Sequence, residues 1–192
     1  MGVFEDLGVM VDGLEDESAE EYGGEVEEIF RFDVYLSQKQ EIEIGVQIAE
    51  VEVEDFPELG DEYGLLAHTF ADLIVEHIGM GTEVLMSSVA ELPELDIDLT
   101  ADEQAAFADE QTNENGSVLL YSFPVLIMDG EDEDDTRQLG TGFNRSRRAD
   151  LMLKVYGDAF AEAEEEYQEM ITDAILDHGL LFIKAVEAVQ IQ

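Results

Sequence analysis

The sequence contains no cysteine and no run of apolar residues long enough for a membrane span. Without cysteine the chain forms neither disulfides nor thiolate metal sites. Cysteine usage therefore does not indicate whether the protein works in a reducing or an oxidising compartment. No apolar run approaches the roughly 18 residues that a membrane-spanning helix needs. The first ten residues carry acidic side chains and no basic segment, which is not the pattern of a secretory signal. We therefore expect a soluble protein with no membrane partner.

Basic residues are also scarce, since eight lysines and arginines stand against 49 aspartates and glutamates and the formal net charge is −41. A compact body with this charge repels itself in dilute buffer. At about 1 M salt the screening length falls to roughly 3 Å, and the repulsion nearly vanishes. The acidic residues alternate with apolar ones along most of the chain, unlike an acidic tail. The composition therefore predicts a protein adapted to concentrated salt, as in a haloarchaeal cytoplasm or a brine, and direct sequence-specific binding of nucleic acid is not expected.

The 192 residues, 45% of them apolar, are enough for one folded domain. Residues 1–24 are rich in Gly, Asp and Glu and are expected to form an acidic N-terminal arm. Residues 25–192 are expected to form a single α+β domain. Within it, residues 27–54 alternate apolar and polar side chains and predict an added N-terminal β-hairpin. The turn falls at Ser37 to Gln40, and a slip of the alternation at Ala49 predicts a bulge or bend.

Two amphipathic helices are predicted to pack on a mixed or antiparallel sheet. The medium one follows Gly60 and ends at Gly79, and the long one begins at Asp158 and ends at Gly179. The segment Thr100–Glu103 has the pattern of a capping box that opens a further short helix.

Four more strands are predicted from short alternating or apolar runs. Pro124 lies within the most apolar of them and predicts a sheet edge or a break between two strands. Single helices thus alternate with pairs of strands, and this order is typical of an α+β domain. The four runs are LDIDL around Ile97, residues 118–128, residues 149–156 and residues 181–191.

No catalytic, cofactor-binding or metal site is predicted. His68 and His77 are nine positions apart, which does not match the four-residue spacing of a helical zinc pair, and His178 suits the last turn of its helix. The acidic run 129–135 fails the pattern of an EF-hand calcium loop, because Asp134 stands where that loop needs glycine. We therefore expect neither an enzyme nor a cofactor.

Half of all the basic residues fall within twelve positions, in the segment from Arg137 to Arg148. Either these arginines pair with the neighbouring acidic loop and pin it, or they form a contact patch for another acidic subunit. An acidic face that meets this segment would build a ring of head-to-tail copies. The predicted subunit interface consists of Arg137, Arg145, Arg147 and Arg148 together with Gln38, Lys39 and Gln40 of the hairpin turn.

A resemblance to a known family is carried by FPVLIMDG, the acidic loop that follows it, RRADLMLKVYGDA and AEAEEEYQEMITDAILDHG. These segments resemble tail-terminator proteins of long-tailed viruses. Such proteins cap the tail tube and join it to the head. The resemblance is closest over roughly the last 75 residues, within a terminator-like core of residues 61–192. It implies a homo-oligomer, a hexameric ring, with no cofactor and no catalysis. It also implies a tail tube protein and a head-closure or neck protein as partners, in the virion of a tailed virus assembled in the cytoplasm of a haloarchaeal host.

Three other functions stay open. The chain fits a haloarchaeal cytoplasmic module that binds a small ligand or a protein without catalysis, and oligomer size discriminates this from a ring. A metal-dependent enzyme that uses carboxylates with His68 or His77 would bind a divalent metal tightly in high salt. An acidic mimic of nucleic acid would compete with DNA for a basic partner.

Overall fold

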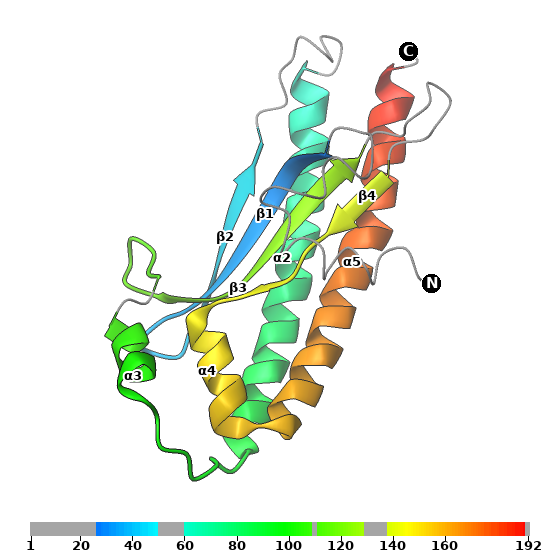
Figure 1. Cartoon of the computed structure of the whole chain (residues 1–192). Coiled ribbons are helices and arrows are strands. Elements are labelled where there is room, and N and C mark those ends of the chain that lie inside the picture. Colours follow the sequence, from blue (N-terminus) through cyan, green and yellow to red (C-terminus); the bar gives the residue numbers. More distant parts are fainter. Residues whose placement is uncertain (1–25, 50–59, 109–110, 129–137, 191–192) are drawn as a thin grey trace.

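A computed structural model of the chain describes residues 26–49, 60–108, 111–128 and 138–190. It confirms an α+β fold in which one antiparallel sheet is covered on one face by two long helices, α2 and α5 (Figure 1). The strands are β1 (Val26–Leu36), β2 (Ile42–Ile48), β3 (Val118–Met128), β4 (Gln138–Thr141) and β5 (Asn144–Arg145). The helices are α2 (Gly60–Glu91), α3 (Ala101–Ala108), α4 (Arg147–Tyr156) and α5 (Asp158–Gln190).

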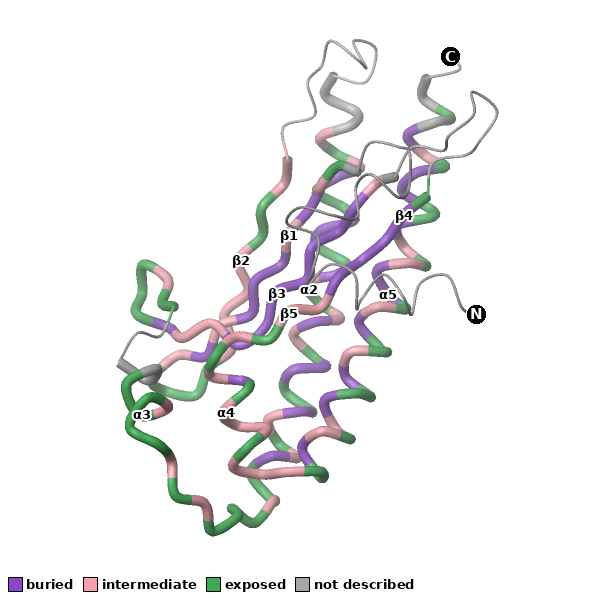
Figure 2. Tube along the Cα trace, viewed as in Figure 1, coloured by how far each residue is buried: buried purple, intermediate pink, exposed green. Residues whose placement is uncertain are grey.

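The core lies between the two central strands and the two long helices (Figure 2). Alternate residues of β1, Phe30, Phe32 and Val34, are buried against the helices. The ring of Phe30 lies 4.8 Å from that of Phe70 in α2 and 5.6 Å from that of Phe182 in α5. The intervening residues of β1 point to the opposite, more polar face of the sheet.

The predicted N-terminal hairpin is present and is an integral part of the sheet. The strand order is β2-β1-β3-β4, and β1 pairs with β3 from Val26 to Leu36. β2 ends at Ile48, next to the predicted slip at Ala49. The rest of the predicted hairpin, residues 50–54, and the predicted arm, residues 1–24, lie outside the described residues.

Both long helices continue past the glycines that were expected to end them, so the predicted medium helix is as long as its partner. Gly79 and Gly179 lie inside α2 and α5. A Cβ on Gly179 would lie 2.0 Å from Cδ2 of Leu139, so this glycine permits the close approach of α5 to β4. Phe182 stays buried on the same helix one turn later, and the strand predicted for residues 181–191 is wrong, since the chain is helical to Gln190.

Two other predicted strands are also wrong. No strand forms around Ile97, and residues 149–156 belong to α4. The helix forms because Oγ of Ser146 caps it by accepting a hydrogen bond from the backbone N–H of Ala149 at 3.2 Å. β3 passes through Pro124 unbroken and is not an edge strand. The proline lies where the neighbour of β3 changes from β4 to β5.

Candidate functional site

The two segments predicted as contact elements lie together at the end of the sheet where α4 begins (Figure 1). Gln40 of the β1–β2 turn and Arg148 of α4 line the same cleft. Arg145 and Arg147 are exposed, and Arg148 is half-buried. Arg137 lies outside the described residues. We call this surface the basic end, and it consists of Gln38, Lys39, Gln40, Arg145, Arg147 and Arg148.

The β1–β2 turn holds its exposed residues in a defined geometry. Oγ of Ser37 accepts hydrogen bonds from the backbone N–H groups of Lys39 at 3.2 Å and Glu41 at 3.0 Å. Gln40 takes a left-handed backbone conformation with φ 65°, uncommon for a residue with a side chain. The turn therefore presents Gln38, Lys39 and Gln40 from a hydrogen-bonded frame.

The cleft of the basic end has an apolar floor and a polar rim. Its volume is about 270 Å³. Gln40 and Arg148 lie at the rim. Interfaces between proteins commonly combine such an apolar centre with a polar edge. The floor is formed by Leu36, Met86, Val89, Leu151, Met152 and Val155.

Behind the basic end lies a buried carboxylate that the sequence analysis did not single out. Glu164 of α5 is only 1% exposed and accepts hydrogen bonds from Nε of Arg145 at 2.5 Å and from the hydroxyl of Tyr121 at 2.8 Å. Burial, and then the nearby carboxylate, raise the pKa of Tyr121 well above its usual range, so the hydroxyl keeps its proton. A signal was present in the sequence, because Glu164 occupies the apolar stripe between Phe160 and Tyr167. Arg145 thus pairs with α5.

A second ion pair joins α3 to α4 beside the basic end. The ammonium of Lys154 donates to Oε1 of Glu103. The predicted capping box is confirmed, because the backbone N–H of Thr100 donates to Glu103 at 2.7 Å and the N–H of Glu103 to Oγ1 of Thr100 at 3.3 Å. The Lys154 ammonium and then Thr100 lower the pKa of Glu103 to about 2. α3 is therefore fastened to α4 by a charged contact at the surface.

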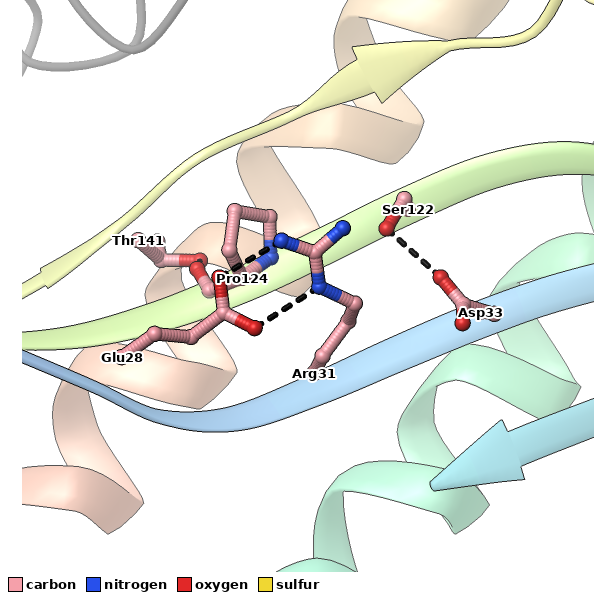
Figure 3. A network of polar contacts seen from close by, with 6 residues as sticks. All are labelled: Glu28, Arg31, Asp33, Ser122, Pro124 and Thr141. Carbon is pink, nitrogen blue, oxygen red and sulfur yellow. Dashed lines mark hydrogen bonds and ion pairs between the residues drawn. The ribbon is translucent and has the colours of Figure 1, made fainter. Parts of the chain in front are cut away.

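The sheet face turned away from the helices carries a polar network (Figure 3). Arg31 donates from two guanidinium nitrogens to the carboxylate of Glu28 at 2.7 and 2.6 Å, and this hydrogen bonding raises the pKa of Arg31. Oγ of Ser122 donates to Oδ1 of Asp33 at 2.6 Å. These groups and Arg145 line an open groove of about 530 Å³.

Among the described residues, the histidines do not converge with carboxylates on a metal site. His68 is exposed, and the rings of His77 and His178 lie 5.2 Å apart between α2 and α5. In the part of the chain that the structure describes, no three His, Asp or Glu side chains are grouped to hold a metal ion. The acidic run 129–135 lies outside that part.

None of the described helices has the length and apolar character that crossing a membrane requires. Comparisons with protein-family models, with curated proteins and with solved structures give no match for this chain.

Proposed function

We propose that this protein is an assembly protein of a tailed virus of halophilic archaea, and that it forms a ring that ends the tail tube and joins it to the head. The basic end carries this proposal. In a chain of net charge −41, Arg145, Arg147 and Arg148 line one cleft. Arg148 also lines the neighbouring apolar cleft, together with Gln40 of the turn that carries Lys39. Arginine is enriched at protein interfaces and pairs with carboxylates through two hydrogen bonds. A basic end and an acidic body on one chain favour head-to-tail contacts between copies, and such contacts build a ring when the rotation between neighbouring copies closes.

The viral role comes from the resemblance to tail-terminator proteins, while the charge distribution supports the assembly role. Two segments that were predicted as strands from their alternating or apolar runs, residues 149–156 and 181–191, are helical here, so the order of elements adds no support to the resemblance. A hexameric ring, a tail tube protein and a head-closure protein as partners, and a place in the virion belong to the same proposal, which includes no catalysis and no cofactor.

The experiment is the mass of the protein in molar KCl, measured by size exclusion with light scattering and followed by negative-stain imaging. We expect closed rings of about six copies, as in the family it resembles. Arg147→Glu with Arg148→Glu should leave a folded monomer, because the double variant replaces direct arginine–carboxylate pairs in the contact by like charges at the same short distance, which molar salt screens least. As a matched pair, Arg147→Gln should weaken assembly and Gln47→Glu should not, although each makes the net charge more negative by one. Unchanged rings in the double variant would remove the basic end from the interface.

The polar groove favours a second function, a binding module for a small anionic ligand. Arg31 and Arg145 both line this groove, and guanidinium groups bind carboxylates and phosphates. A protein that stays monomeric at all concentrations would favour this function. The direct test is isothermal titration in molar KCl with inorganic phosphate and with citrate, comparing the natural chain with Arg31→Gln. Heats that are equal for both proteins would count against it.

A further inference from the structure

Apolar side chains are exposed on the two long helices. Seven of the nine large apolar residues exposed in the described part of the chain belong to α2 and α5, so this exposed apolar surface is concentrated on the helical layer. Leu73, Met80 and Val84 recur at helical spacing on one side of α2, and Val84 is 67% exposed. Met170 and Leu181 share one side of α5 and are 44% and 62% exposed.

These side chains lie along the seam between α2 and α5 on the side away from the sheet. The rings of His77 and His178 lie 5.2 Å apart across the seam. A Cβ on Gly81 would lie 2.3 Å from Cε of Met170. The two antiparallel helices are therefore in a register that places Met80 beside Met170. We call this surface the outer helical face.

Carboxylates flank the apolar residues of the outer helical face. Glu76 and Glu83 alternate with the apolar residues of α2, and Asp173 and Asp177 do the same on α5. All four are exposed, and α2 contains no lysine or arginine. The face is thus apolar along its centre and negative at its edges.

We infer that the outer helical face of one copy receives the basic end of the next copy, an inference that rests on the proposed function. The two surfaces match in apolar character and in charge. The basic end has an apolar cleft whose polar lining is Gln40 and Arg148, and Arg147 and Arg148 together line the cleft next to it. Two outer helical faces would instead set carboxylates against carboxylates, which is unfavourable. Because the two surfaces are different parts of one chain, their contact repeats from copy to copy, and it gives the proposed ring when the rotation between copies closes.

The apolar centre of the outer helical face is smaller than the helical layer. It runs from Leu73 to Val84 and from Met170 to Leu181, about 17 Å at 1.5 Å per residue, and covers roughly 350 Å² across two helices. Since each partner buries ~800 Å² in a stable interface of standard size, the contact also includes the carboxylates that flank this centre.

The absence of cysteine makes site-directed crosslinking specific. Chains carrying only Arg147→Cys are mixed in molar KCl with chains carrying only Val84→Cys, allowed to exchange subunits and treated with a short bis-maleimide. We expect linked dimers in the mixture, and none when Val84→Cys is replaced by the control Gln47→Cys on β2. Linked dimers from Val84→Cys alone would show that two outer helical faces meet and would overturn the inference. Rings without any link in the mixture would also overturn it.

Charge exchange tests the same contact independently. Glu76→Arg with Glu83→Arg should raise the dissociation constant of the ring contact at least ~10-fold. Combining these with Arg147→Glu and Arg148→Glu in one chain should restore assembly. The control, Glu94→Arg with Asp98→Arg, changes the charge equally at exposed positions outside the face and should have no effect. An equal loss of assembly in Glu76→Arg with Glu83→Arg and in the control variant would overturn the inference. A natural chain that forms no rings would instead refute the proposed function itself.

Discussion

Arg145→Ala tests the buried carboxylate that anchors the basic end. The substitution leaves Glu164, 1% exposed, with the Tyr121 hydroxyl as its remaining hydrogen-bond donor among the pairs described above. Removing one partner of a buried ion pair costs about 3–5 kcal/mol. The Arg145 side chain is 41% exposed, so water reaches the vacated position, and we expect a loss of about 2 kcal/mol in the free energy of unfolding.

The assay is urea unfolding in molar KCl followed by far-ultraviolet circular dichroism. Arg147→Ala is the matched control, because Arg147 is exposed and such substitutions change stability by no more than about 0.5 kcal/mol. The double variant Arg145→Ala with Glu164→Gln should lose less free energy of unfolding than the two single variants lose together. The reason is that the glutamine amide leaves no buried charge without a partner. Equal unfolding midpoints for Arg145→Ala and Arg147→Ala would refute the reasoning.

Two further predictions concern packing and titration. Gly179→Ala should destabilise the fold by about 1–3 kcal/mol through overpacking against Leu139, whereas Gly64→Ala, with nothing within 4 Å of its new Cβ, should stabilise α2 by about 0.5–1 kcal/mol. Urea midpoints that move in the same direction would contradict the packing argument. The pKa of Glu103 is about 2, below the ordinary 4.5, so its contribution to stability is present above pH 4.5 and is lost as the pH falls towards 2. Lys154→Ala should raise this pKa towards 4.5 in an NMR titration, and an unmoved midpoint would show that the ion pair is not its cause.

The sequence predicted the candidate site only in pieces. Charge counting singled out the arginines, and alternation placed Gln38 to Gln40 in a turn. The approach of Gln40 and Arg148 around one cleft depends on the pairing of β3 with both β1 and β5, which no local pattern contains. Glu164 was missed because a glutamate within an acidic run is expected to face solvent. Only its partners on β3 and β5 show that it is buried.

Local periodicity determined what each element is when one face of it meets the core and the other meets solvent. The alternation in β1 and β2, the capping box at Thr100 and the apolar stripe of α5 are of this kind, and the net charge is a property of composition alone. Tertiary structure decided the cases in which one residue type serves two purposes. A glycine ends a helix or lets another element approach it, and only the position of Leu139 shows that Gly179 does the second. The reason is physical, since a residue's neighbours along the chain set its local preference, whereas the atoms packed against it come from elements far away in sequence.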